Sequence, residues 1–153
     1  MPRKYKIVVL RGDGVSREVI PEAVKALKAA QEVVTGLKLD FAEFECGFEY
    51  YKKTGEPWPP QAYEACKESD AILYGAVGLP GVEGLEHIVY VHRVLRQNLD
   101  LYANVRPVKL RDNVNCPLVG KKAGDIDFVI VRENTEDLYA PMRGVLTRAE
   151  TAE

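Results

Sequence analysis

The first 41 residues alternate between strand-like and helix-like patterns, and this alternation constrains the fold more than any other feature. Residues 6–10 form a short apolar run rich in β-branched side chains, as in a buried strand. Residues 16–34 repeat apolar side chains at steps of three and four, which predicts a helix with one buried face. Leu37, Leu39 and Phe41 alternate with polar residues and predict a second strand. The pattern therefore predicts an α/β fold with at least some parallel strand pairing.

The ends of these elements can also be predicted. Ser16 is predicted to be the N-cap of the helix and Val19 its first core residue. Gly36 stands where the chain needs a left-handed residue after the helix. The predicted apolar face continues through Ala23, Ala26, Leu27, Ala30, Val33 and Val34. The further predicted elements are helices over 48–53, 60–69 and 88–99 and strands over 71–74, 102–108 and 127–131.

Composition and charge exclude several classes of protein. The chain has 46% apolar and 29% charged residues, which is typical of a folded globular protein and not of a disordered one. Its 21 basic and 23 acidic residues give a formal net charge of −2, so no basic excess is available to bind nucleic acid. No apolar run approaches the roughly 20 residues of a membrane span. The three cysteines lie far apart, without metal-site spacing, so we expect a cytoplasmic protein that binds neither nucleic acid nor membrane.

Two glycine-rich segments are candidates for ligand loops. The segment Gly12-Asp13-Gly14 lies between a predicted strand and a predicted helix, which is the context of a phosphate loop. The third glycine of a dinucleotide fingerprint is missing, so a tight strand-to-helix turn is the stronger interpretation. The second segment is typical of a loop that passes close to a ligand. Its glycines, at intervals of three, are Gly75, Gly78, Gly81 and Gly84.

Three arginines and one tyrosine are candidates for binding and chemistry. Arg96, Arg106 and Arg132 lie on three different predicted elements, the last two after apolar strands. Arginine binds carboxylates in a bidentate way, so three converging arginines would suit a substrate with two carboxylates. The alternative is that each arginine pairs with a surface acid. Tyr139 is either a proton donor or an ordinary core tyrosine.

No metal or hydrolytic signature accompanies these residues. His87 and His92 are five apart without a third partner, so a solvated or capping role is expected for both. Residue patterns alone therefore predict an α/β chain and leave anion binding as one option.

Four blocks, taken together, are more specific than any one of them. With them the chain resembles the β-decarboxylating dehydrogenases, which comprise the isopropylmalate, isocitrate, homoisocitrate and tartrate/D-malate dehydrogenases. The blocks are Gly12-Asp13-Gly14 with Glu18-Val19, Gly75-Ala76-Val77-Gly78, Leu95-Arg96 with the run from Leu99 to Pro107, and the run from Val131 to Glu136.

Within this family the chain is most similar to the tartrate/D-malate branch, through Glu49-Tyr50-Tyr51 and the run 116–128. Isocitrate enzymes carry a serine and an asparagine where this chain has Tyr90 and His92, which argues against isocitrate. Arg93 resembles the extra arginine of homoisocitrate enzymes, so a tricarboxylate substrate remains an alternative. Two local departures are Ser16-Arg17 in place of glycine-proline and Asp137 in place of glycine.

The resemblance implies an isopropylmalate dehydrogenase-like two-domain α/β fold, not a Rossmann fold, here truncated. Residues 1–99 would be part of the first, cofactor-side domain and 100–153 the start of the second, substrate and dimerisation domain. The catalytic lysine, the metal-binding aspartates and the adenosine loop of the family have no counterpart, so we expect an N-terminal half. It would act as a homo-oligomer or with a complementary C-terminal polypeptide.

The implied reaction is NAD-dependent oxidation of a 2-hydroxy acid followed by loss of CO₂, with Mg²⁺ or Mn²⁺ held by the missing half. By resemblance, Arg96, Arg106 and Arg132, with Arg93 as the branch-dependent member, would bind substrate, and Tyr139 would protonate the enol. The cofactor-side loop would consist of Gly75, Ala76, Val77 and Gly78. The isolated chain is expected to be inactive, and a non-catalytic domain that keeps only a carboxylate or nucleotide site is the alternative from another class.

Overall fold

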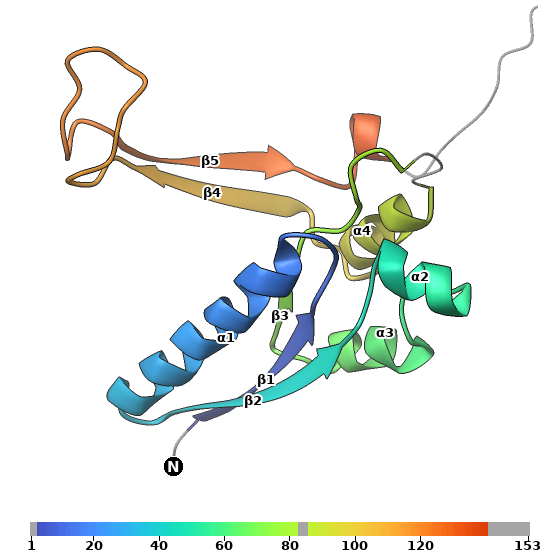
Figure 1. The fold of residues 1–153 in the computed structure, drawn as a ribbon. Helices are drawn as coiled ribbons and strands as arrows, with labels where there is room; N and C mark the ends of the chain where they lie inside the picture. Colours follow the sequence, from blue (N-terminus) through green and yellow to red (C-terminus); the bar gives the residue numbers. More distant parts are fainter. Residues whose placement is uncertain (1–2, 83–85, 141–153) are drawn as a thin grey trace, which may run out of the picture. The chain divides into compact units, whose positions relative to one another are not determined.

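The computed structural model describes residues 3–82 and 86–140 of the chain (Figure 1). The chain forms two compact units, Met1–Val94 and Leu95–Glu153. The first unit contains β1 (Arg3–Leu10), α1 (Ser16–Val33), β2 (Leu37–Phe44), α2 (Phe48–Thr54), α3 (Pro60–Lys67), β3 (Ala71–Tyr74) and most of α4 (Glu86–Asn98). The second contains the end of α4, β4 (Ala103–Lys109), β5 (Asp127–Glu133) and a 3₁₀ turn (Asp137–Tyr139).

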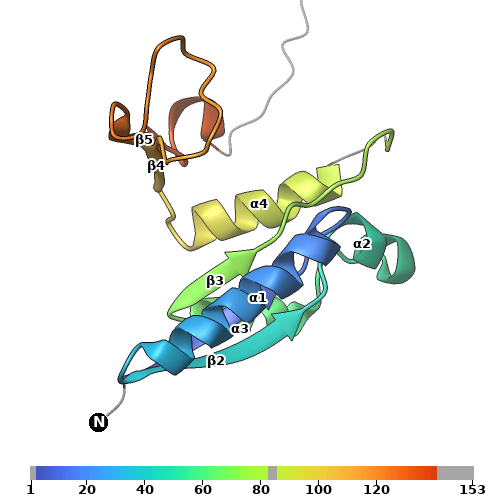
Figure 2. The same cartoon turned by 60° about the vertical axis from the view of Figure 1, so that its left-hand side comes forward.

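A three-stranded parallel sheet with the order β2-β1-β3 forms the centre of the first unit. The predicted parallel pairing is therefore confirmed. In β1, Arg3 to Leu10 pair with Leu37 to Phe44 of β2, and Ile7 to Leu10 pair with Ala71 to Tyr74 of β3. Helices α1 and α3 cover opposite faces of this sheet (Figures 1 and 2).

The core on the α1 face corrects the predicted helix face. Val9 packs with Ile20 and Val24 of α1, which are 5% and 7% exposed. Val19, the predicted first core residue, is 55% exposed, and Val33 is also exposed. The alanine-rich repeat is compatible with two helix faces that are offset by one residue. The longer side chains of Ile20 and Val24 lie on the face that packs against the sheet.

Ser16 is not the N-cap of α1, as the sequence predicted, but its first helical residue. Val15 occupies the cap position and makes no side-chain cap bond. The Ser16 side chain is buried, and its hydroxyl donates to the carbonyl of Ala76 at 3.1 Å. The Ser16 side chain therefore makes a tertiary contact and not the capping bond that the local pattern predicted.

The second unit is built on an antiparallel ribbon, in which Ala103 to Lys109 of β4 pair with Glu133 to Asp127 of β5. Apolar side chains on both faces of this ribbon are exposed, among them Val105, Val108, Phe128, Val129, Ile130 and Val131. The boundary between the units falls inside α4, at Val94, whereas the predicted domain boundary at residue 99 of a larger protein stays a prediction.

Among the helices of the described ranges, none combines the length and the apolar character needed to cross a bilayer.

Candidate functional site

Three loops of the first unit meet at the carboxyl ends of its parallel strands, and Asp13 joins them. Its side chain is 1% exposed. The backbone N–H groups of Phe48 and Gly78 donate to Oδ2 at 2.7 and 2.8 Å, and that of Glu49 donates to Oδ1 at 3.0 Å. One carboxylate thus fixes both the start of α2 and the loop after β3.

Glycines allow these loops to approach so closely. A Cβ at Gly47 would overlap the Asp13 carboxylate, and a Cβ at Gly12 would overlap the carbonyl oxygen of Ala76. That oxygen also accepts a bond from the Asp13 N–H at 2.8 Å. The segment Gly12-Asp13-Gly14 is therefore a tight turn that packs against the next loop, as the simpler interpretation predicted.

The predicted cofactor-side loop lies where α/β sheets bind nucleotides, beyond the carboxyl end of a parallel strand. Gly75 is buried against Arg11 and Ser16, whereas Ala76 is exposed and Val77 and Gly78 are half-buried. The loop is thus anchored on its inner side and open on its outer side, which fits a cofactor ring laid against it. Gly84 lies outside the described residues, as do the side chains of His87 and Tyr90.

His92 has a specific partner, so the expected solvated or capping role is wrong. Its Nδ1 lies 3.0 Å from the hydroxyl of Tyr74, and the two rings meet edge to face with centroids 5.0 Å apart. This contact joins α4 to β3 within the first unit.

In the second unit, the ribbon brings two predicted substrate arginines together. Arg106 lies in the middle of β4 and Arg132 next to the end of β5, so both lie within strands and not after them. Asn104 is directly opposite Arg132 in the register and shares a face with Arg106, two residues along. The arginines are therefore diagonal neighbours on one face of the ribbon.

Both arginines donate to asparagine oxygens. Arg106 Nε donates to Asn104 Oδ1 at 3.0 Å, and Arg132 Nη2 donates to Asn134 Oδ1 at 2.8 Å. Asn134 is itself buried, and its Nδ2 donates to the carbonyl of Leu101 at 3.4 Å. Sequence reasoning missed both asparagines, although each stands two residues from an arginine, the spacing that places two side chains on one strand face.

Tyr139 lies beside Arg132. The Arg132 guanidinium carbon is 4.9 Å from the centroid of the Tyr139 ring, which is a cation–π contact. Gln97 Nε2, in the last turn of α4, donates to the Tyr139 carbonyl at 2.9 Å. Arg96, the residue before Gln97, therefore belongs to the same unit as Arg106, Arg132 and Tyr139, whereas Arg93 lies one turn earlier on α4 and in the first unit.

Glu133 lies between Arg132 and Asn134 in sequence but does not neutralise the arginines. It accepts bonds from the Thr135 hydroxyl at 2.6 Å and from the N–H groups of Thr135 and Glu136, each at 2.7 Å. The hydroxyl bond, with these backbone donors, lowers the pKa of Glu133 to about 2. Its charge therefore stabilises the turn after β5.

A metal site is not formed by the described residues. In ranges 3–82 and 86–140, no three His, Cys, Asp or Glu side chains gather as a metal would need. Burial raises the pKa of Cys46 to about 12 and that of Cys66 to about 11, which keeps both thiols protonated. The described residues thus do not fit a divalent cation.

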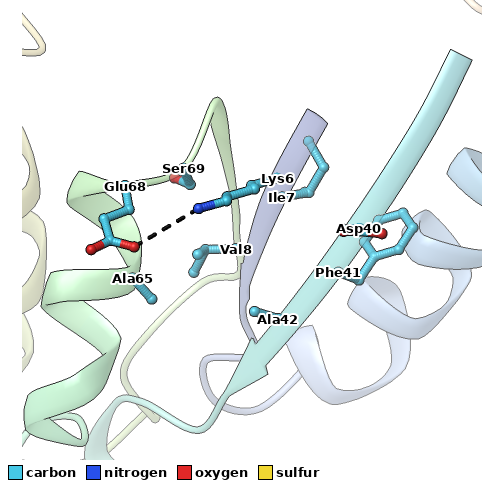
Figure 3. Close-up of a pocket in the computed structure, with 9 residues that line it drawn as sticks. All are labelled: Lys6, Ile7, Val8, Asp40, Phe41, Ala42, Ala65, Glu68 and Ser69. Atoms are coloured by element: carbon cyan, nitrogen blue, oxygen red, sulfur yellow. Dashed lines mark ion pairs between the residues drawn. The ribbon is translucent and has the colours of Figure 1, made fainter. Parts of the chain in front are cut away.

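A hollow of about 420 Å³ lies on the other face of the sheet, away from α1 (Figure 3). It contains an ion pair between Lys6 and Glu68 with a 3.9 Å separation. Its lining consists of Lys6, Ile7, Val8, Asp40, Phe41, Ala42, Ala65, Glu68 and Ser69. None of the predicted site residues is among them.

Comparison with known proteins gives consistent matches along most of the chain. The family model described as isocitrate/isopropylmalate dehydrogenase matches residues 6–153. The D-malate dehydrogenase [decarboxylating] of Escherichia coli (strain K12) is 42% identical over 147 residues, which cover 94% of this chain and 40% of that protein. The tartrate dehydrogenase/decarboxylase of Pseudomonas putida is 41% identical over 145 residues, which cover 93% and 39%.

The solved structures agree with these matches. The crystal structure of isocitrate dehydrogenase from Methylococcus capsulatus superposes with a TM-score of 0.74 at 29% identity and covers 95% of this chain and 39% of that one. The predicted family resemblance and fold class are therefore confirmed. The chain spans about two fifths of the length of the curated relatives it matches.

Proposed function

Because this chain belongs to the isocitrate/isopropylmalate dehydrogenase family, we propose that it forms the N-terminal portion of an NAD- and divalent-metal-dependent oxidative decarboxylase. The proposed substrate is a 2-hydroxy dicarboxylic acid of the D-malate or tartrate type, and the proposed location is the cytoplasm. The names of two relatives, a D-malate and a tartrate enzyme, support this substrate class. In this proposal a complementary C-terminal polypeptide supplies the catalytic lysine and the metal ligands.

The observation that carries the proposal is the arginine face of the ribbon. Arg106 and Arg132 are diagonal neighbours, and their side-chain hydrogen bonds go to neutral amides. Two adjacent cations that have no bonded carboxylate among the described residues repel each other, and a bound dianion relieves this repulsion while it accepts charge-assisted hydrogen bonds. A substrate with two carboxylates supplies that dianion.

In this proposal the family resemblance supplies the roles of the chain's own residues. Arg96, Arg106 and Arg132 hold the substrate carboxylates and thereby orient the C2 hydrogen. NAD, when bound, supplies the hydride acceptor, and the loop from Gly75 to Gly78 is its proposed binding loop. The proton of the C2 hydroxyl passes to a base outside the described residues, the resulting β-keto acid loses CO₂, and Tyr139 donates its phenolic proton to the enol carbon. No step is assigned to a metal, because the described residues do not provide its ligands.

Arg93 favours a second substrate class. It lies three residues before Arg96, and residues at this spacing are neighbours on one side of a helix. An additional cation there would favour a third carboxylate, as in homoisocitrate, while isopropylmalate remains an alternative within the family. A domain that binds a carboxylate or nucleotide without catalysis is the alternative from another class.

Calorimetric titration of the chain with D-malate tests the proposal. We expect saturable binding, and Arg106→Ala and Arg132→Ala should each weaken it by tenfold or more, because a charge-assisted bidentate contact is worth on the order of 2–3 kcal/mol. Lys109→Ala is the matched control, since Lys109 lies on the same ribbon but pairs with Asp127 at 2.7 Å. Equal binding by all three variants would contradict the assignment.

Activity is the second test. Without a metal site among its described residues, the chain alone should not reduce NAD with D-malate, tartrate, isopropylmalate or homoisocitrate in the presence of Mn²⁺. Turnover that survives repurification and disappears in Tyr139→Phe would show that the chain is catalytically self-sufficient.

A further inference from the structure

The side chains that hold Arg106 and Arg132 differ from the partners of other cations in the chain. Lys4, Arg11, Arg17 and Lys109 each form an ion pair with a carboxylate, namely Asp40, Glu43, Glu49 and Asp127. In contrast, the two ribbon arginines donate to the amide oxygens of Asn104 and Asn134. A carboxylate partner would neutralise the guanidinium, whereas an amide oxygen fixes its direction and leaves its charge in place.

Asn134 is especially constrained. Its side chain is 7% exposed, and its amide donates to the Leu101 carbonyl while its oxygen accepts from Arg132. Within the described part of the chain, Arg132 Nε is buried and has no hydrogen-bond partner. The Arg132 guanidinium is therefore directed by the bond to Asn134 at Nη2 and by the Tyr139 ring beside it.

Asn104 has an equivalent position for the other arginine. It shares the strand face with Arg106 and accepts from its Nε at 3.0 Å. Because it is also directly opposite Arg132 in the register, it occupies the place between the two cations. An acidic side chain at this place would attract both guanidinium groups and compete with any anionic ligand.

We infer that Asn104 and Asn134 are positioning residues, which hold Arg106 and Arg132 through neutral amide oxygens so that both positive charges remain available to a dicarboxylate. This inference rests on the proposed substrate site but adds two residues that act through the arginines and not on the substrate itself. Their neutrality, as well as their hydrogen bonds, is the property that matters.

Two kinds of substitution separate these properties. Asn104→Asp and Asn134→Asp keep an oxygen acceptor and add a negative charge, whereas Asn104→Leu and Asn134→Leu remove the acceptor at similar size. Asn113→Asp adds the same charge in the β4–β5 connection, at a residue with φ of 62° that aspartate tolerates, and serves as the charge control. The half-buried Asn104 keeps the test valid if a variant at the buried Asn134 fails to fold.

The experiment combines D-malate titration with nitrogen-15 relaxation of the arginine Nε–Hε groups at pH 6. In the aspartate variants we expect ordered guanidinium groups and D-malate affinity at least tenfold below that of the parent. In the leucine variants we expect the paired arginine to become mobile and affinity to fall about threefold to tenfold. Asn113→Asp should bind within twofold of the parent.

Each arm can overturn the inference. Unchanged Nε–Hε order in both leucine variants would show that the asparagines do not position the arginines. Binding within twofold of the parent in Asn104→Asp would show that neutrality has no role. If the parent chain does not bind D-malate at all, both the proposed substrate and the dicarboxylate part of this inference are contradicted. The relaxation data then still decide whether the two asparagines position the arginines.

Discussion

Asp13 shows how one buried side chain can determine the shape of a candidate cofactor site. Its two oxygens accept three backbone N–H groups from the segments after β2 and β3. The sequence placed Asp13 in a turn but could not show which way its carboxylate points. The partners lie 35 to 65 residues away, and such contacts are outside any local pattern.

Asp13→Ala should lower the free energy of unfolding by about 3 kcal/mol or more, because each buried donor left without an acceptor costs roughly 1–3 kcal/mol. Urea denaturation followed by circular dichroism measures this loss. Asp112→Ala, which alters an exposed carboxylate, is the control and should stay within about 0.5 kcal/mol of the parent. A similar effect of both changes would mean that the Asp13 bonds do not stabilise the fold.

Glu133 predicts a pH dependence of the turn after β5. Its pKa is lowered to about 2 from an ordinary value of 4.5, so its bonds stabilise the turn above pH 4.5 and are lost as the pH falls towards 2. The amide signals of Thr135 and Glu136 should therefore shift with a midpoint near pH 2. In Glu133→Gln this transition should disappear, and a parent midpoint near 4.5 would refute the assigned hydrogen bonds.

At the scale of elements, the sequence predicted most helices and strands of the described residues, because periodicity and glycine positions are local signals. Pro60 begins α3, as predicted, and Gly55 ends α2 in the left-handed region. The buried stripe of α1 was misplaced by one residue, since the alanine-rich pattern does not define which side faces the sheet. Local sequence patterns also could not predict that Arg106 and Arg132 share one face of the ribbon, because the pairing register decides which residues lie side by side.

Two valine substitutions test the corrected stripe of α1. Val24→Ala should lower the free energy of unfolding by about 1–2 kcal/mol, because it removes buried methyl groups next to Val9. Val19→Ala, at a position 55% exposed, should change it by less than about 0.5 kcal/mol. Thermal denaturation of both variants decides the question, and a larger loss in Val19→Ala would restore the face that the sequence predicted.

At the scale of the whole molecule, the β4–β5 ribbon determines how the chain behaves in solution. An isolated two-stranded ribbon is marginally stable in water, and this one exposes apolar side chains on both faces. Exposed strand edges and apolar patches are sites of association. We therefore expect the ribbon to be covered by other polypeptide, either a further copy of this chain or a complementary one.

The chain should accordingly not persist as a well-packed monomer. Sedimentation equilibrium at low micromolar concentration should show oligomers, and added complementary polypeptide should convert them into a defined complex. Near-ultraviolet circular dichroism reports whether the side chains are packed. A sharp 17.1 kDa monomer that unfolds cooperatively would contradict this expectation.

The carboxylate of Asp13 also has a consequence for the order of folding. The bonds that it accepts span 35, 36 and 65 residues, so none of them can close while the intervening chain is still unpaired. Contacts of such long sequence separation form late and slowly, because the entropy of loop closure opposes them until neighbouring strands have docked. The glycine loop after β3 should therefore acquire its shape in the final kinetic phase, and a nascent chain that ends before Gly78 would leave the Asp13 carboxylate without one of its three donors even if β1, α1 and β2 had already assembled.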